Sequence, residues 1–419
     1  MLFIRICFLF LFVVLTLFKS WGQGVSSNGQ FFNLQLNTIT TAVPFLMIGP
    51  DATHAGMADA GAGAPASPHS LHWNQAQLAF LSDSGMFNQQ CLQKNFGASL
   101  NYSSWLRALV PGINVFDFSG YKVTGRRSSI SASFKYFSLG EITFFSSTGP
   151  SNRTYRPWEF AAQLGYTRKI TKSFSMGVSG KFIYSDLAGS VLPGVVPGKA
   201  FAGGISMLYK SKQFKLLTKQ FQVSAGAQIS NVGNKIFYTN DSIGDFIPQN
   251  LKVGIGISVE LSEQVILVLV ADANKLLVPT PPLYLRDVNG NTIVDPYGNY
   301  VVAEGMDPNV SVFEGIKQSF YDAPGAYYDD SGVLQQIGVG IEEFREINWS
   351  FASELRIAET VFLRSGFFYE HYTKGNRQYA TVGLGGKYKM YEANVSLLLP
   401  TSQQHPLAKT IRFGIAMTL

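Results

Sequence analysis

The sequence predicts an all-β protein, a transmembrane antiparallel β-barrel of about 14 strands preceded by an N-terminal plug. Three observations support this fold class. Apolar residues occupy every second position in many segments, which is the period of a strand whose two faces meet different environments. Charged residues make up 14% of the chain, aromatic residues 14%, and glycine 41 of 419 residues, which suits a sheet between lipid and a polar lumen. No stretch reaches 18 consecutive apolar residues, so no transmembrane helix is predicted.

Residues 1–22 are predicted to form a secretory signal peptide. Arg5 is the only early charge, and the apolar run 6–18 that follows it is too short to span a bilayer comfortably. Ser20 and Gly22 are small residues at the spacing that a signal peptidase prefers, which predicts Gln23 as the mature N-terminus.

Residues 23–94 are predicted to form a hatch, or plug, in the barrel mouth. This segment is rich in glycine, alanine and proline and shows no sustained alternation. It is also longer than an ordinary connection. We therefore expect it to lie inside the barrel rather than in its wall.

Residues 95–419 carry the alternating segments of the barrel wall. The candidate segments are 95–105, 113–123, 128–138, 139–147, 157–170, 173–185, 200–210, 220–231, 250–261, 264–273, 335–345, 347–358, 360–371, 378–390, 391–400 and 408–419. One or two of these segments could be bent halves of a single strand. An even number of strands is expected when both ends of the chain face the periplasm. A soluble sandwich would show the same alternation, but aromatic residues cluster near the segment ends, as in interfacial girdles.

A long extracellular loop is predicted at 279–336. It carries eight acidic residues against two basic ones, and Asn289-Gly290 predicts a hairpin turn within it. Acidic and aromatic side chains together could receive a partner, although a simply solvated loop is the alternative. The candidate contact residues are Tyr284, Asp287, Tyr297, Tyr300, Phe313, Tyr327 and Tyr328.

The last strand is predicted to close the barrel. Ile411, Phe413, Ile415, Met417 and Leu419 share one face, up to the final residue of the chain. A terminal strand needs a neighbour for its open edge, and closure of a barrel provides one. The tail also resembles the terminal insertion signal of outer-membrane barrels, with Leu419 in place of the usual aromatic residue. The residues of this predicted signal are Arg412, Gly414, Met417 and Leu419.

The residues do not predict a catalytic or cofactor site. The five histidines fall in apparent loops or at a strand end, and no nucleophile, histidine and carboxylate can be combined from the sequence. His69 and His72 could in principle bind a metal with Asp51 or Asp59, but such loop histidines are usually surface residues. Cys91 is the single cysteine of the predicted mature chain and is interpreted as an inert thiol. Basic residues lie in turns, where contact with membrane or lipopolysaccharide is expected rather than nucleic acid.

A long run in the predicted plug resembles a known family. The run comprises Asn37 to Asp51, then Gly56-Met57, Asp59-Ala-Gly61 and Leu71-His-Trp-Asn74. It resembles the N-terminal signature of the PorV family of the type IX protein secretion system. The motif residues are Asn37, Thr38, Pro44, Pro50, Asp51, Gly56, Asp59, Gly61, Trp73 and Asn74. The sequence departs from the family pattern at Gln75, where proline is usual, at Ala58, where glycine is usual, and at His54-Ala55.

The resemblance implies a fold and a role. PorV-like proteins look like relatives of the FadL fatty-acid channels, which are 14-stranded barrels with an N-terminal plug. The implied role is to take cargo by its C-terminal signal domain from the translocon pore of the type IX system. The cargo would then pass to the cell-surface attachment complex with its sortase. This predicts a non-enzymatic protein of the outer membrane of a Gram-negative bacterium. The alternatives are a FadL-like channel for hydrophobic small molecules and a lipid-modifying barrel enzyme.

Overall fold

The computed structural model describes residues 36–81 and most of 95–419. Within the second range, residues 108–109, 111, 145–152, 190, 193, 240–243, 288–289, 330, 402–406 and 409 lie outside the described part. The predicted signal peptide and Cys91 also lie outside it.

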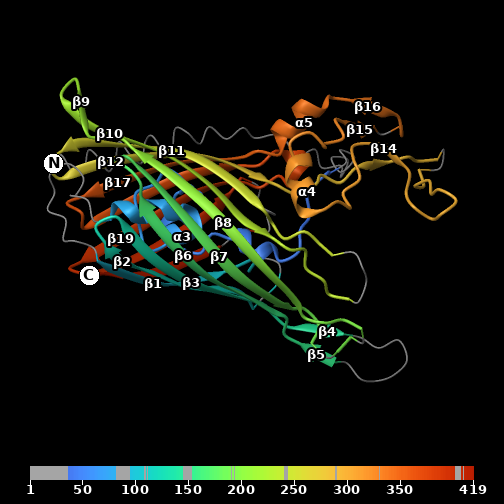
Figure 1. Cartoon of the computed structure of the whole chain (residues 1–419), viewed down its shortest axis with the longest axis horizontal. Helices are drawn as coiled ribbons and strands as arrows, with labels where there is room; N and C mark the ends of the chain where they lie inside the picture. The colour runs from blue at the N-terminus through green and yellow to red at the C-terminus, as the bar shows by residue number, and fades with distance from the viewer. Residues whose placement is uncertain are drawn as a thin grey trace.

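The wall is one closed antiparallel sheet (Figure 1). Its strands are β1 (Phe96–Ser104), β2 (Ile113–Gly125), β3 (Ser128–Leu139), β6 (Trp158–Lys169), β7 (Phe174–Asp186), β8 (Gly198–Lys210), β10 (Lys219–Gly233), β11 (Asn250–Ser262), β12 (Val265–Leu276), β17 (Asn348–Ile357), β18 (Val361–Tyr369), β19 (Gln378–Tyr388), β20 (Tyr391–Pro400) and β21 (Ile411–Thr418). Each pairs with the next strand of this series, and β21 pairs with β1 to close a ring of 14 strands. The predicted barrel is therefore confirmed.

Two of the predicted wall segments are wrong. Segment 139–147 is not a separate wall strand, because β3 ends at Leu139 and Gly140 follows with a φ of 81°. The chain then forms a short hairpin of β4 (Ile142–Phe144) and β5 (Arg153–Tyr155). Segment 335–345 contains β16 (Leu334–Gln336) and the helix α5 (Val339–Arg345). The remaining 14 predicted segments each correspond to one wall strand.

The two ends of the barrel differ in the length of their connections. At the end where β1 begins and β21 ends, the connections include 126–127, 263–264, 358–360 and 389–390, and a short strand, β9 (Phe214–Leu216), pairs with β10. At the opposite end the connections include 140–157, 234–249 and 277–347. Short periplasmic turns and long extracellular loops are typical of outer-membrane barrels, so the first end is periplasmic.

Side chains alternate between lipid and lumen along each strand. In β21, Phe413 is 51% exposed on the outer face, whereas Arg412 is 3% exposed on the inner face. Aromatic side chains gather towards the extracellular ends of neighbouring strands, for example Trp158, whose ring contacts the rings of Tyr136 and Tyr184. This is the expected interfacial girdle. Within the described residues, no helix has the length and apolar character needed to cross a membrane.

Four short helices lie in the segment 36–81, which is called the plug below. They are η2 (Pro44–Met47), α2 (Ala52–Ala55), α3 (Ser70–Trp73) and η3 (Gln75–Phe80). Figure 1 shows this segment, in blue, inside the ring of strands. Another short helix, η5 (Tyr372–Lys374), lies outside the plug, between β18 and β19.

The connection 277–347 forms a small unit outside the barrel, called the extracellular subdomain below. It contains β13 (Leu283–Tyr284), which pairs with β14 (Val302–Glu304), and β15 (Ala326–Tyr328), which pairs with β16. The helices α4 (Val312–Gln318) and α5 complete it. The predicted hairpin turn is confirmed, because Arg286 pairs with Thr292 across Gly290, whose φ is 83°.

Candidate functional site

The plug runs through the lumen from the extracellular mouth to the periplasmic end. At the mouth, the Asn37 amide donates to the Thr373 carbonyl oxygen at 3.0 Å, and the Ala42 amide donates to the Phe246 carbonyl oxygen at 2.9 Å. At the other end, η3 packs against β6, β7 and β8, and Lys169 Nζ lies 4.9 Å from the centre of the Phe80 ring. The plug therefore spans the whole lumen.

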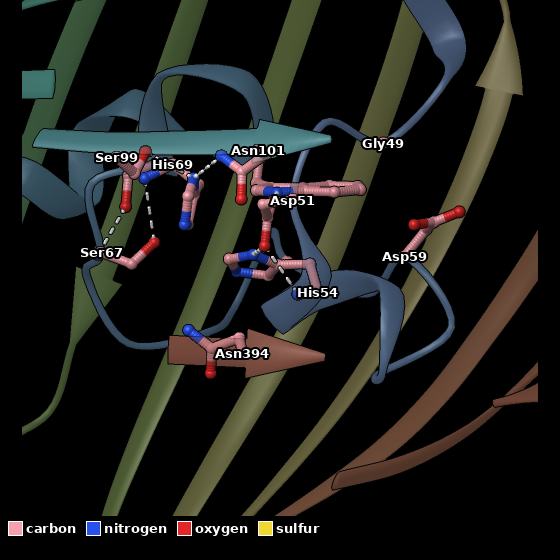
Figure 2. A network of polar contacts seen from close by, with 12 residues as sticks. Gly49, Asp51, His54, Asp59, Ser67, His69, Ser99, Asn101 and Asn394 are labelled. Atoms are coloured by element: carbon pink, nitrogen blue, oxygen red, sulfur yellow. Dashed lines mark hydrogen bonds and ion pairs between the residues drawn. The ribbon is translucent and has the colours of Figure 1, made fainter. Parts of the chain in front are cut away.

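Asp51 organises the centre of the plug (Figure 2). It caps α2, since its Oδ1 atom accepts from the His54 amide at 2.8 Å and lies 2.9 Å from His54 Nδ1. Its Oδ2 atom accepts from Trp73 Nε1 at 2.7 Å. All three side chains are buried. An aspartate before a short helix is a favoured N-cap, and the charge of the carboxylate strengthens these hydrogen bonds.

His69 lies against the wall beside this centre. Figure 2 shows Ser99 and Asn101 of β1 directed towards it, and its Nδ1 atom lies 3.2 Å from Ser99 Oγ and 3.5 Å from Asn101 Nδ2. Both Ser99 and His69 are buried. A nucleophilic serine needs a histidine that a carboxylate orients, but Asp51 binds His54 and Trp73 instead. The contact joins the plug to β1.

A second link joins the plug to the last strand. Arg412 Nη1 lies 3.0 Å from Asp59 Oδ1 and donates to the Gly49 carbonyl oxygen at 3.0 Å. Asp59 and the preceding Ala58 have φ values of 61° and 52°. This left-handed conformation is the one that glycine adopts without strain, so the departure at Ala58 falls on a position where glycine has a physical advantage.

The end of the plug is clamped by amide side chains. Asn74 Nδ2 donates to the carbonyl oxygens of Ala62 and Met207, at 2.9 and 3.0 Å. Gln75 Nε2 donates to the carbonyl oxygens of Tyr166 and Val178, each at 2.8 Å. The departure at Gln75 therefore adds wall contacts that a proline could not make.

Close backbone approach also fixes the plug. A Cβ atom at Gly226 of the wall would overlap the Ala62 carbonyl oxygen, and one at Gly63 of the plug would overlap the backbone of Ile255 in β11. The Gly61 and Ala62 amides donate to Asp272 Oδ2, at 2.6 and 2.9 Å. Glycines on both sides of the contact thus let the plug backbone lie directly on the wall.

An apolar layer packs the plug against the wall in the extracellular half of the lumen. It joins η2 of the plug to strands on one side of the barrel, and Phe45 stacks on Phe137 with ring centres 5.9 Å apart. Its buried members are Val43, Phe45, Leu46, Ile48, Val115, Phe137, Ala161, Ile183, Ala200, Ala202, Ile236 and Ile247.

Two small cavities lie beside the plug, and the smaller one borders the apolar layer at Leu46. A cavity of about 90 Å³ is lined by His54, His69 and charged wall residues that include Arg356 and Lys387. A second cavity of about 20 Å³ is lined by Pro50, His69, His72 and wall residues that include Asp117 and Lys135. The second is large enough for a water molecule but not for an organic ligand.

Buried ion pairs fasten the extracellular subdomain to the barrel rim. Lys275 Nζ, at the end of β12, lies 2.9 Å from Glu343 and 2.7 Å from Glu346. Lys374 Nζ, in η5, lies 2.6 Å from Glu342 and 3.0 Å from Glu346. These five side chains are at most 11% exposed. Removal of one partner would leave a buried charge without compensation, so the cluster holds α5 firmly.

This cluster also reaches the plug and the rest of the subdomain. Asn37 Nδ2 donates to Glu342 at 3.2 Å, and the Thr280 hydroxyl donates to Glu346 at 2.8 Å. Asp322 accepts from the Thr280 amide at 3.0 Å, and burial raises the pKa of its carboxyl to about 6. The sequence did not predict this cluster of glutamates and lysines. The signal that could have indicated it was the presence of charged residues at the ends of alternating segments.

The predicted contact residues of the subdomain differ in exposure. Tyr297, Tyr300 and Phe313 are 89%, 61% and 79% exposed. Tyr328 is buried, packs with Leu283, Ala326 and Leu334, and donates a hydrogen bond to the Tyr284 carbonyl oxygen at 3.0 Å. Asp287 is exposed, while Tyr284 and Tyr327 are partly buried. Tyr297, Tyr300 and Phe313 thus have most of their surface exposed to solvent.

The other predicted motif residues lie along the plug. Thr38 lies near the mouth, Pro44 opens η2, Pro50 lines the smaller cavity, and Gly56 accepts a hydrogen bond from Thr381 of the wall. Gly414 and Arg412 face the lumen, whereas Met417 and Leu419 share the outer face of β21. Among the described residues, no group of three or more histidine, cysteine, aspartate or glutamate side chains is arranged to hold a metal ion.

The family model described as type IX secretion system protein PorV matches residues 31–283. The chain belongs to the PorV family. The match covers the plug, whose residues suggested the family, and the wall as far as β12. Family membership and the closed barrel make this PorV-family chain an outer-membrane protein of the type IX secretion system.

No curated protein sequence matches the chain. Solved structures with similar folds include the toluene transporter TbuX of Ralstonia pickettii, at 12% identity and a TM-score of 0.43, covering 88% of this chain and 98% of TbuX. The toluene transporter TodX of Pseudomonas putida has 9% identity and a TM-score of 0.42, with 92% and 99% covered. A FadL homologue of Pseudomonas aeruginosa has 10% identity and a TM-score of 0.40, with 91% and 98% covered.

Proposed function

We propose that this PorV-family protein receives type IX cargo by its C-terminal signal domain at the translocon pore. It then carries the cargo to the cell-surface attachment complex and its sortase. The single observation that carries this proposal is the family match across the plug and most of the wall. In this role the protein binds and delivers, and it requires no catalytic group.

The extracellular subdomain is the proposed contact surface. It stands on buried ion pairs and presents Tyr297, Tyr300 and Phe313 to the outside. Aromatic side chains on a firmly held support are enriched at protein interfaces, because they bury a large area with little loss of side-chain freedom.

The position of the described plug residues within the lumen supports delivery outside the barrel rather than transport through it. The apolar layer around Phe45 packs the plug against one side of the extracellular half, and cavities of about 90 and 20 Å³ beside the plug are far smaller than ordinary ligand pockets of roughly 300–1,000 Å³. The alternative, a channel for hydrophobic small molecules, would require the plug to move.

Deletion of the gene tests the function. We expect cargo with the type IX C-terminal domain to accumulate in the periplasm or on the translocon and to be lost from the cell surface. Normal secretion together with lost growth on a hydrophobic carbon source would contradict the proposal and favour the channel.

Substitution of Tyr297, Tyr300 and Phe313 by serine tests the contact surface without touching the rim anchors. Surface display of cargo should fall while the folded barrel still reaches the outer membrane. The matched control replaces Tyr388 and Tyr391, which are 73% and 60% exposed at the periplasmic end, and should retain display.

A further inference from the structure

Helix α5 buries its acidic side chains and exposes its large apolar ones, the reverse of an ordinary surface helix. Glu342 and Glu346, one turn apart, are 4% and 5% exposed and face the protein. Ile341 and Phe344 are 56% and 62% exposed. Residues three or four apart share a helix face, so the charged side of α5 is buried and its apolar side is open.

The buried side of α5 reaches the outer surface of the wall. Lys275, which binds Glu343 and Glu346, lies on the same face of β12 as Leu269, because both are odd-numbered positions of one strand. Leu269 is 42% exposed on the lipid-facing side. The contact with Lys275 therefore holds α5 over the outside of the barrel wall as well as over its mouth.

The open side of α5 continues into the aromatic girdle. The Phe344 ring lies 6.0 Å from the ring of Trp349, on the strand that α5 leads into. Trp349 and Phe351 share the outer face of β17, and Phe351 is 51% exposed there. Figure 1 shows α5 at the extracellular end of the barrel. The apolar side of α5 is thus continuous with the surface that the wall presents to lipid.

We propose that α5 is an interfacial helix whose apolar side, formed by Ile341 and Phe344, is buried in the outer leaflet of the outer membrane. The occupant of this surface is lipid acyl chain at headgroup depth, where an amphipathic helix places its apolar face. The buried acidic side then fixes the angle at which the extracellular subdomain stands on the membrane. Tyr297 and Tyr300 remain free for a protein partner. This inference does not depend on the cargo role.

Site-directed fluorescence tests the proposal. Cys91 is replaced by serine, and a single cysteine at Ile341 or, separately, at Phe344 is labelled with the polarity-sensitive dye NBD. The protein alone is refolded into phosphatidylcholine vesicles that carry a lipid-borne quencher. Both labels should show blue-shifted emission and lose about half of it to a quencher 5–10 Å below the surface. Leu269→Cys on the wall serves as the lipid-exposed control, and Tyr297→Cys as the solvent-exposed control.

Two outcomes would overturn the proposal. One is solvent-like, unquenched emission at both 341 and 344 while Leu269→Cys is quenched. The other is an emission shift that occurs only in native outer membranes, which would assign the apolar side to a protein partner. Heat-resistant migration of each labelled barrel shows that it is folded, so neither outcome can be confused with failure to fold.

Discussion

Arg412 in the last strand and Asp59 in the plug form an ion pair of 3.0 Å across 353 positions of sequence. The pair joins the residue predicted to belong to the insertion signal with a residue of the predicted plug motif. Arg412 faces the lumen and is almost fully buried. The closing strand of the barrel therefore also holds the plug.

Replacement of either partner should destabilise the protein strongly. Asp59→Asn leaves the buried Arg412 guanidinium without its charged partner, which should cost about 3–5 kcal/mol. Arg412→Met leaves the Asp59 carboxylate, which is 19% exposed, without its charged partner and should cost somewhat less. The double variant should cost less than the sum of the two. Urea unfolding of the refolded barrel in detergent measures this. The control is Arg156→Met, because Arg156 and Glu141 form a pair whose side chains are 78% and 51% exposed, and its loss should change stability by less than about 1 kcal/mol. Equal effects at the two sites would refute the buried link.

The insertion signal predicts a separate effect at the last residue. The Leu419 amide donates to the Phe96 carbonyl oxygen at 2.8 Å, and its side chain is 51% exposed on the outer face. Leu419→Asn should slow barrel assembly in cells and lower stability by about 1–2 kcal/mol, because it removes apolar contact with lipid. Leu419→Phe should assemble at least as fast as the native chain. A time course of heat-resistant barrel formation distinguishes these outcomes, and equal rates for all three would argue against the signal.

Gln75 should hold the periplasmic end of the plug. Gln75→Ala removes two hydrogen bonds to the wall, each contributing about 1 kcal/mol, and should increase hydrogen exchange in residues 76–80. Gln75→Pro, the residue usual in the family, also removes the backbone amide donor and should have at least as large an effect. Unchanged exchange in both variants would show that other contacts hold this helix.

Phe45 should be required for the seal. Phe45→Ala removes a fully buried ring from the apolar layer, a change that typically costs about 3–5 kcal/mol when the cavity does not collapse. The expected result is increased ion conductance in planar bilayers. Phe134→Ala is the matched control, because Phe134 is 44% exposed on the outer face, and it should not leak.

The fastening of the extracellular subdomain should depend on pH. Burial raises the pKa of Asp322 to about 6, above the ordinary value of 3.8, so the folded state binds the proton more tightly than the unfolded state does. This group therefore stabilises the subdomain more as pH falls from about 7 towards 4, and the contribution is lost as pH rises through 6.

Limited proteolysis at pH 5 and pH 8 measures this effect. The native chain should be cleaved faster in residues 279–336 at pH 8, while Asp322→Asn should remain equally protected at both values. Cleavage of the native chain at the same rate at both pH values would contradict the assignment.

The sequence by itself determined the barrel and the place of the plug. A period of two residues is a local property, so 14 of the sixteen predicted segments are wall strands. The same signal failed at 335–345, where Ile337, Val339 and Ile341 alternate with glycine but most of the segment is helical. Gly338 turns the chain with a φ of 92°. The glutamates that follow it form ion pairs with Lys275 at the end of β12 and Lys374 in η5.

Only the tertiary structure decided how the plug is threaded and held. The links from Asp59 to Arg412, from Gln75 to β6 and β7, and from α5 to Lys275 and Lys374 join residues far apart in sequence. No local pattern encodes such pairs, because each buried charge or amide is stable only when closure of the barrel brings its partner to it.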